Sequence, residues 1–391
     1  MKTTISGTIR LLLPVFLGIF LSGCFMPNEP VEPSGDAPEA TGWDMEVITD
    51  GLEHPWSMAW LPDGDMLITE RPGRLRIVRN GAVDPEPVQG LPVIYTDGQG
   101  GLLDVALHPD FEDNQYVYLS YASGSEDANR TTVGRGVFEG DRLADFTTLF
   151  EVAPDKNGNQ HFGSRILWLP GNTFLLSIGD GGNRPISLDN ELIRNQAQKL
   201  NSHLGKILHL KDDGSPAPGN PFGNIRDARP EIWTLGHRNV QGLALDPATG
   251  RVWANEHGSR GGDELNLIQG GKNYGWPITT YSREYYGPRI SDKTTKPGMA
   301  DPKIVWTPAQ APSGLAFYTG DRFSEWQGDL FSGGLRGEQV RRIILDGEDV
   351  AGEESLEIGR RVRDVRQGPD GYLYLLTDEE NGELIRIVPD L

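Results

Sequence analysis

The chain has 391 residues and carries 36 Lys and Arg against 56 Asp and Glu, which gives a formal net charge of −20. Such an acidic chain repels phosphate backbones, so nucleic-acid binding is excluded as its main function. A content of 37% hydrophobic residues, 50 Gly and 28 Pro also excludes a largely disordered chain and a polytopic membrane protein. A turn-rich, all-β protein is what remains.

Residues 1–23 have the features of an export signal. Lys2 and Arg10 give a positive start, and residues 11–21 form an apolar run that is too short to span a bilayer, which takes about 20 residues. The run ends in Leu-Ser-Gly-Cys, which resembles the lipobox of bacterial lipoproteins, so we expect lipidation at Cys24. An ordinary signal peptide followed by a chance cysteine is the alternative. Because Cys24 is the only cysteine, the exported chain forms no internal disulfide.

Residues 24–41 are rich in Pro, Glu, Gly and Ala, which predicts a flexible tether between the lipid and a folded domain over residues 42–391. No Asp follows Cys24, and resemblance to lipoprotein sorting rules then favours the outer membrane over the inner one. We therefore expect a periplasm-facing protein that meets the membrane only through its lipid anchor.

From Trp43 onward a turn followed by a short alternating apolar strand recurs six times. Pro presets φ in these turns and Gly accepts a positive φ. The turns lie about 61 residues apart on average, which suits a four-stranded blade with its loops. The sequence therefore predicts a six-bladed β-propeller, with a strand near Met45–Ile48 that pairs with the last blade and closes the ring. A β-sandwich with long loops is the alternative. The six turns are residues 61–65, 108–110, 169–172, 246–250, 325–329 and 368–371.

The long loops of a propeller gather at one face around the central channel, so polar loop motifs are the candidates for chemistry. The chain has no His-x-x-x-His spacing, no phosphate loop and no Gly-x-Ser-x-Gly elbow. The Gly-rich stretch 179–182 is expected between strands without a helix, which does not favour a phosphate cradle. Asp263 and Glu264 beside several glycines resemble a site for a hard cation such as calcium, which binds carboxylate and carbonyl oxygens. Four motifs stand out, at residues 97–109, 159–166, 236–243 and 255–277.

In this order the four motifs resemble those of the soluble quinoprotein sugar dehydrogenases, the glucose/sorbosone dehydrogenase family, over nearly all of residues 43–388. The resemblance implies a six-bladed propeller that uses pyrroloquinoline quinone (PQQ) and Ca²⁺. The chain lacks the longer insertions of the glucose-specific branch, so it is more similar to the aldose sugar dehydrogenases, and we expect a monomer. No Cys-x-x-Cys-His haem motif is present, so electrons are expected to leave to a separate quinone or cytochrome.

The resemblance assigns the chemistry to three residues. His161 would be the general base that takes the hydroxyl proton at the anomeric carbon of an aldose, since a neutral imidazole can accept a proton near pH 7. Arg238, in the sequence His-Arg-Asn, would stabilise negative charge that grows on a quinone oxygen. Asn239 would also touch the quinone. The expected product is a lactone.

Further residues are assigned to the cofactor and the sugar by the same resemblance. Arg361 and Arg363 match a pair that holds the carboxylates of the cofactor, as bidentate guanidinium groups do. Arg336 stands where the glucose dehydrogenases have Lys and would keep a positive charge at the cofactor. Gln99 matches a substrate-contacting Gln, and Gln160 stands where glucose-preferring members have Asp, which argues against a strict preference for glucose.

Two calcium ions are implied. The first would be bound by the backbone oxygens of Gly258 and Ser259 and would polarise the quinone carbonyl. The family often has Pro in place of Ser259, but only a carbonyl is needed there. The second, structural ion would use Glu264 and the carbonyl of Tyr274.

Two other functions fit a propeller. A calcium-dependent lactonase would hold its metal with acidic side chains in the channel, which this sequence does not obviously supply, and it would turn over lactones without a quinone. A non-catalytic ligand-binding propeller would bind its ligand equally well after His161→Ala, because fold alone does not imply catalysis.

Overall fold

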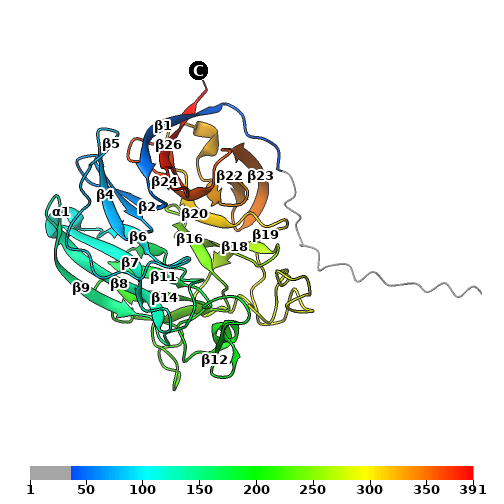
Figure 1. The fold of residues 1–391 in the computed structure, drawn as a ribbon. Coiled ribbons are helices and arrows are strands. Elements are labelled where there is room, and N and C mark those ends of the chain that lie inside the picture. The colour runs from blue at the N-terminus through cyan, green and yellow to red at the C-terminus, as the bar shows by residue number, and fades with distance from the viewer. Residues whose placement is uncertain (1–36, 391) are drawn as a thin grey trace, which may run out of the picture.

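Six four-stranded antiparallel sheets form the computed structural model of the chain, which describes residues 37–390 (Figure 1). The predicted signal and Cys24 lie outside the described residues. We call the sheets blades 1 to 6 in chain order. Blade 1 has β2 (Pro55–Trp60), β3 (Met66–Glu70), β4 (Arg74–Arg79) and β5 (Ala82–Val83). Blade 2 has β6 (Leu102–Leu107), β7 (Tyr116–Gly124), β8 (Asn129–Phe138) and β9 (Leu143–Glu151). Blade 3 has β10 (Ile166–Leu169), β11 (Thr173–Ile178), β14 (Lys206–Lys211) and β15 (Ile232–Leu235).

The remaining blades follow the same pattern, and a few short elements decorate the loops. Blade 4 has β16 (Val240–Leu245), β17 (Val252–Glu256), β18 (Asp263–Ile268) and β19 (Ile304–Trp306). Blade 5 has β20 (Pro312–Phe317), β21 (Leu330–Gly334), β22 (Gln339–Asp346) and β23 (Asp349–Glu357). Blade 6 has β24 (Val362–Gln367), β25 (Leu373–Thr377), β26 (Gly382–Pro389) and β1 (Trp43–Leu52). The short elements are α1 (Phe111–Asn114), β12 (Ser187–Leu188), β13 (Glu191–Leu192), η1 (Ile193–Gln198) and η2 (Ser324–Trp326).

The ring closes as the sequence predicts. β1 pairs antiparallel with β26, so that Trp43 lies opposite Pro389 and Leu52 lies opposite Gly382. Figure 1 shows the blue β1 beside the red β26. Because the last blade takes one strand from the N-terminal side, the sheet edge left by β26 is covered and the propeller has no open seam there.

The first strand of each blade faces the middle of the ring. Consecutive first strands contact one another all the way round, from β2 through β6, β10, β16, β20 and β24 and back to β2. These strands therefore meet around one central axis. The residues at their starts lie close together although they are far apart in the sequence, and the candidate site is built there.

The turns that reverse the chain within a blade are the predicted ones, but two of them include or lead into a short helix, and one of these is η2 at the turn of residues 325–329. Gly64 between β2 and β3 has a φ of +94°, and Gly371 before β25 has a φ of +82°, which only glycine adopts without strain. The turn at residues 108–110 does not lead directly into a strand. It continues into the single-turn helix α1 and then into β7.

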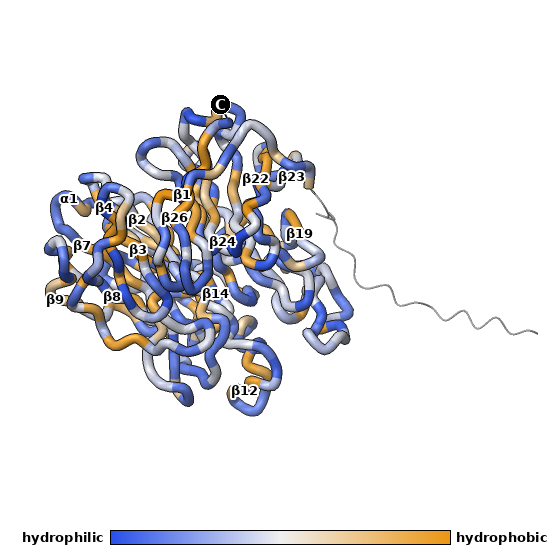
Figure 2. Tube along the Cα trace, turned by 45° about the horizontal axis from the view of Figure 1, so that its top comes forward, coloured by the Kyte–Doolittle hydropathy of each residue, from blue (hydrophilic) through white to orange (hydrophobic). Residues whose placement is uncertain are grey.

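The core consists of apolar layers between neighbouring blades. Figure 2 shows apolar stretches along the strands and hydrophilic residues in the loops. Between blades 1 and 2, for example, alternate strand residues are fully buried against each other, as expected for strands with a period of two. This layer includes Leu67, Leu75, Val105, Val117 and Leu119.

Part of the segment predicted as a flexible tether is docked on blade 5. The backbone N–H of Ala40 donates to the Ser355 carbonyl on β23, and the Ser355 N–H donates to the Pro38 carbonyl, both at 2.9 Å. The ordered fold thus begins a few residues before the predicted boundary at residue 42. Within residues 37–390, no helix is long and apolar enough to cross a membrane.

Candidate active site

His161 is buried and held by a carboxylate. Its Nδ1 lies 2.6 Å from Asp180 Oδ1, and the side chain is 3% exposed. Since a carboxylate only accepts, Nδ1 carries the proton and Nε2 is left with a lone pair. Burial, together with the charge of Arg238, lowers the pKa of His161. The imidazole is therefore neutral near pH 7 and can act as a base at Nε2.

The backbone around His161 is arranged for this contact. His161 has a φ of +51°, an uncommon conformation for a side chain of its size. A Cβ on Gly179 would lie 2.0 Å from the His161 carbonyl oxygen, so only glycine allows the two segments to approach so closely. The close approach brings Asp180 to the imidazole. Trp276 fixes the carboxylate from the other side, since its Nε1–H donates to Asp180 Oδ2 at 2.7 Å.

Arg238 is linked to His161 through Asn183. The Arg238 Nη2 donates to Asn183 Oδ1 at 2.8 Å, and Nη1 donates to the His257 carbonyl at 3.1 Å. The Asn183 Nδ2 lies 3.4 Å from His161 Nε2. The buried Nε of Arg238 has no hydrogen-bond partner in the described part of the chain. A cation with an unused donor thus lies next to the base.

A cavity of about 300 Å³ opens beside these groups. Residues on both sides of His161 connect it to the cavity wall. The backbone N–H of His161 donates to Gln99 Oε1 at 2.7 Å, and the N–H of Gly163 donates to Asn239 Oδ1 at 3.1 Å. Gln99, Gly163 and Asn239 all line the cavity, and so does Phe162. The side chains of His161 and Arg238 lie just behind this lining.

Three guanidinium groups and one carboxylate give the cavity a positive wall. Arg71, Arg361 and Arg363 line it together with Asp378. Arg363 Nη2 lies 2.7 Å from Asp378 Oδ2, and although burial opposes it, Arg363 holds the pKa of Asp378 well below its usual range. The Nε atoms of Arg71 and Arg363 are buried, and neither has a hydrogen-bond partner within residues 37–390. The wall therefore suits a ligand with carboxylates.

The other predicted residues for cofactor and sugar lie at different depths. Gln160 is half-buried, and its Oε1 accepts from Asn183 Nδ2 at 2.9 Å, so it belongs to the His161 cluster. Arg336 is exposed and is not part of the cavity lining, although its neighbour Leu335 is. The assignment of Arg336 to the cofactor stays a prediction.

The two neighbouring acids on β18 do not act as a pair. Asp263 accepts from the backbone N–H groups of Gly258, Gln310 and Ala311, each at 2.7 Å, so it fixes the loops around it. Glu264 points the other way, as the period of two in a strand requires, and lies opposite Glu256 on β17. Burial, and then the charge of Glu256, raises the pKa of Glu264 well above its usual value. A half-buried carboxylate beside another carboxylate is a place where a cation would be stabilising.

Of the remaining predicted calcium ligands, one shares a hollow with this carboxylate. Gly258 and Glu264 line one small hollow. The Ser259 N–H donates to Ser282 Oγ at 3.1 Å, and the Tyr274 ring stacks on His237 with ring centres 4.7 Å apart. Within residues 37–390, no group of three or more His, Cys, Asp or Glu side chains is placed to hold a metal ion. A cation here would thus depend on backbone carbonyls, as the predicted ligands do.

The sequence profile of the glucose/sorbosone dehydrogenases matches residues 52–386. This chain belongs to that family. An uncharacterized protein of Synechocystis, slr1608, is 52% identical over 97% of this chain and 98% of its own. The aldose sugar dehydrogenase YliI of Escherichia coli is 41% identical over 88% of this chain and 93% of its own. A structure of the PQQ-bound form of an aldose sugar dehydrogenase from Streptomyces coelicolor has a TM-score of 0.70 and 30% identity, and it covers 90% of this chain and 100% of its own.

Four residues that the sequence did not single out also lie at the site. Asp180 was hidden in a Gly-rich turn, and its signal was the run of glycines that allows a close approach. Asn183 and Arg71 had no sequence signal. His257 lies inside the fourth motif and lines the cavity, and its Nε2 donates to the Pro312 carbonyl at 2.7 Å. Burial, and then the charge of Arg238, lowers the pKa of His257 to about 3, so it stays neutral.

Proposed function

We propose that this protein oxidises aldose sugars at the anomeric carbon to lactones, with PQQ and Ca²⁺ as cofactors. The observation that carries the proposal is the oriented base His161–Asp180 beside a cavity with a positive wall. Membership of the family and the PQQ-bound aldose sugar dehydrogenase relative support the same conclusion.

The donor set of the cavity suits PQQ, which is flat and carries several carboxylates. Arg361 and Arg363 would hold the carboxylates, and Arg71 offers a further unused Nε–H. Asn239 lines the same cavity and would contact the ring system. When bound, PQQ supplies a quinone carbon that accepts a hydride, and Ca²⁺ supplies a Lewis acid that polarises the quinone oxygen.

The proton chemistry belongs to His161. Its Nε2 takes the proton from the hydroxyl on the anomeric carbon, while the same carbon loses a hydride, and the sugar becomes the lactone. Asp180 keeps the proton on Nδ1 and stabilises the imidazolium that forms. Arg238 is fixed by Asn183 and the His257 carbonyl, so its charge is already in place where negative charge develops.

The sugar and metal contacts complete the proposal. Gln99 and Gln160 use their carbonyl oxygens inside the protein, which leaves their amide nitrogens to donate to sugar hydroxyls. The first Ca²⁺ would be bound by the carbonyls of Gly258 and Ser259. A second would be bound by Glu264 and the Tyr274 carbonyl, where it would offset the repulsion between Glu264 and Glu256.

We further propose that the protein works as a monomer on the periplasmic side of the outer membrane, anchored through a lipid on Cys24, and passes electrons to a separate quinone or cytochrome. These points rest on the sequence alone. A test is the incorporation of labelled palmitate into the full-length protein and its loss in Cys24→Ser.

The proposed activity is tested by reconstitution. The domain over residues 37–391 is stripped with a chelator and assayed by dye reduction with glucose, galactose, xylose and maltose, with PQQ and Ca²⁺ added singly and together. We expect activity only with both, and its loss in His161→Ala. Turnover of a lactone without PQQ would instead identify a lactonase. The absence of both PQQ binding and activity would favour a non-catalytic propeller, and PQQ binding without activity would mean that none of the four sugars is the substrate.

A further inference from the structure

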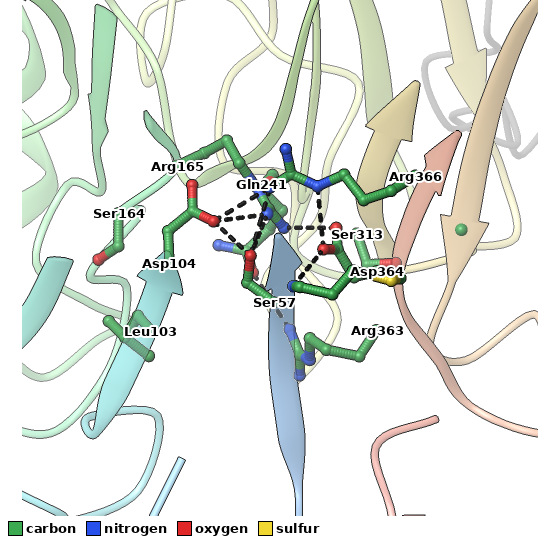
Figure 3. Close-up of polar contacts among 12 residues, drawn as sticks. Ser57, Leu103, Asp104, Ser164, Arg165, Gln241, Ser313, Arg363, Asp364 and Arg366 are labelled. Carbon is green, nitrogen blue, oxygen red and sulfur yellow. Dashed lines mark hydrogen bonds and ion pairs between the residues drawn. The ribbon is translucent and has the colours of Figure 1, made fainter. Parts of the chain in front are cut away.

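A closed set of ion pairs lies at the centre of the ring, next to the cavity. Figure 3 shows its members, Asp104, Arg165, Asp364 and Arg366. Arg165 lies 3.1 Å from Asp104 Oδ1 and 3.1 Å from Asp364 Oδ1, and Arg366 lies 3.1 Å from an oxygen of each carboxylate. Both aspartates are fully buried and Arg165 is 2% exposed. The two positive and two negative charges cancel, so we treat these four residues as one network.

The network joins several blades. Asp104 is on β6 of blade 2, Asp364 is on β24 of blade 6, and Arg165 immediately precedes β10 of blade 3. Ser57 on β2 of blade 1 donates its hydroxyl to Asp104 Oδ1 at 2.5 Å. The Arg165 Nε donates to the carbonyl of Gln241, on β16 of blade 4, at 2.9 Å.

Two members of the network, and Ser57 that donates to it, directly follow a residue that lines the cavity. The two residues of each pair are neighbours in the first, innermost strand of a blade. A shift of the buried residue therefore moves its neighbour in the cavity wall. The pairs are Trp56–Ser57, Leu103–Asp104 and Arg363–Asp364.

Arg165 also contacts cavity residues itself. Its guanidinium lies 4.4 Å from the centre of the Trp56 ring, a cation–π distance. Its partner Gln241 lines the cavity and accepts from Arg363 Nη1 at 3.3 Å through Oε1. Arg366, by contrast, is 29% exposed on its side chain, and its hydrogen bonds go to Ser57, Asp104 and Asp364.

A buried ion network is weak evidence for stability, because desolvation of the charges offsets much of their attraction. Such a network does impose a geometry, since both oxygens of Asp104 and Oδ2 of Asp364 accept hydrogen bonds, and Asp364 Oδ1 lies 3.1 Å from a nitrogen of Arg165. We propose that Arg165, which precedes blade 3, sets the register of blades 1, 2, 4 and 6 at the cavity through its contacts in this network, and that it is a positioning residue for the cofactor wall. The part that concerns the cofactor rests on the proposed binding of PQQ.

The two arginines of the network offer a matched comparison. Arg165→Lys and Arg366→Lys each keep the charge and replace a planar fork with a single ammonium. Only the first removes the hydrogen bond to Gln241 and the contact with Trp56. The probe is PQQ with Ca²⁺, titrated into the chelator-stripped domain by calorimetry, with the Tm of each apo variant measured in parallel. Backbone hydrogen exchange is followed in segments 55–58, 102–105 and 361–364.

We expect Arg165→Lys to weaken PQQ binding about ten-fold or more, as loss of a charge-assisted hydrogen bond would. Arg366→Lys should change the affinity for PQQ by less than about two-fold, even if it lowers the Tm as much as Arg165→Lys does. Equal effects of the two substitutions, or none from Arg165→Lys, would overturn the proposal. If the unaltered domain binds no PQQ, the proposed function fails, and the hydrogen-exchange data alone then test the role of the network. Faster exchange in the three segments for Arg165→Lys but not for Arg366→Lys supports the network's role, and identical exchange refutes it.

Discussion

Asp180→Asn tests the base more sharply than removal of the imidazole, because it keeps the shape of the site. The carboxylate accepts from His161 through Oδ1 and from Trp276 through Oδ2. An amide has one acceptor and one donor end, so it cannot satisfy both partners. If the oxygen keeps Trp276, the amide nitrogen faces His161 Nδ1 and drives the imidazole proton to Nε2, where the lone pair is needed.

The expected loss of activity follows from this change of tautomer. Positioned general bases contribute about 10²- to 10⁴-fold, so kcat for the aldose should fall by that range, which corresponds to roughly 3–5 kcal/mol. Asp180 also raises the pKa of His161 against the effect of burial. Its loss therefore lowers that pKa further, and the acid limb of any residual kcat/KM profile should move to lower pH.

The assay is steady-state dye reduction from pH 4 to 9, with PQQ affinity and Tm as controls. Trp276→Phe is the matched variant, since it removes the donor to Oδ2 and leaves the bond to His161 intact. It should retain far more activity than Asp180→Asn. A kcat for Asp180→Asn within about three-fold of the parent, or an acid limb displaced to higher pH, would refute this role of the carboxylate.

Three further predictions concern the cofactor wall, the metal and the fold. Arg363→Met should weaken PQQ binding about ten-fold or more by calorimetry, because it removes a donor from the wall and the guanidinium that lies nearest to Asp378. Arg336→Met should weaken it less, because that side chain is exposed, and the reverse order would contradict the placement of the wall. Added Ca²⁺ should raise the Tm of the parent domain more than that of Glu264→Gln, in which the carboxylate is gone, and an equal rise would place the ion elsewhere. Leu52→Ala, at a fully buried position of β1, should lower the free energy of unfolding in urea by about 2–5 kcal/mol, whereas no change would mean that ring closure adds little to stability.

The architecture could be predicted because turn chemistry and strand alternation are local. Pro and Gly mark the reversals within each blade, and the apolar strand near Met45 had to find a partner edge. The helix α1 was missed because the turn at residues 108–110 gives no signal for a further helical turn. The docking of Pro38–Ala40 was missed because its contact with Ser355 is made by backbone atoms, which composition does not reveal.

The sequence predicted only those residues of the site that belong to recognisable motifs. His161, Arg238 and Asn239 stand in loops that carry recognisable patterns, and all three lie at or directly behind the cavity. Asp180 and Asn183 act through contacts between the loops of blades 3 and 4, which depend on how these segments meet in space. The same limit applies to Arg165, which stands in a noted motif, while its partners come from strands up to 199 residues away in the case of Asp364.

The proposed function gives His161 the role of the base in sugar oxidation coupled to reduction of PQQ. The most direct measurement is a single-turnover experiment without oxygen or dye, in which the loaded domain is mixed with an aldose and the absorbance of the cofactor is followed together with the lactone formed. We predict that one lactone appears for each cofactor reduced, and that His161→Ala slows both about 10²-fold or more while it still binds PQQ. Reduction at the parent rate in His161→Ala, or lactone formation without a change in the cofactor, would contradict the account.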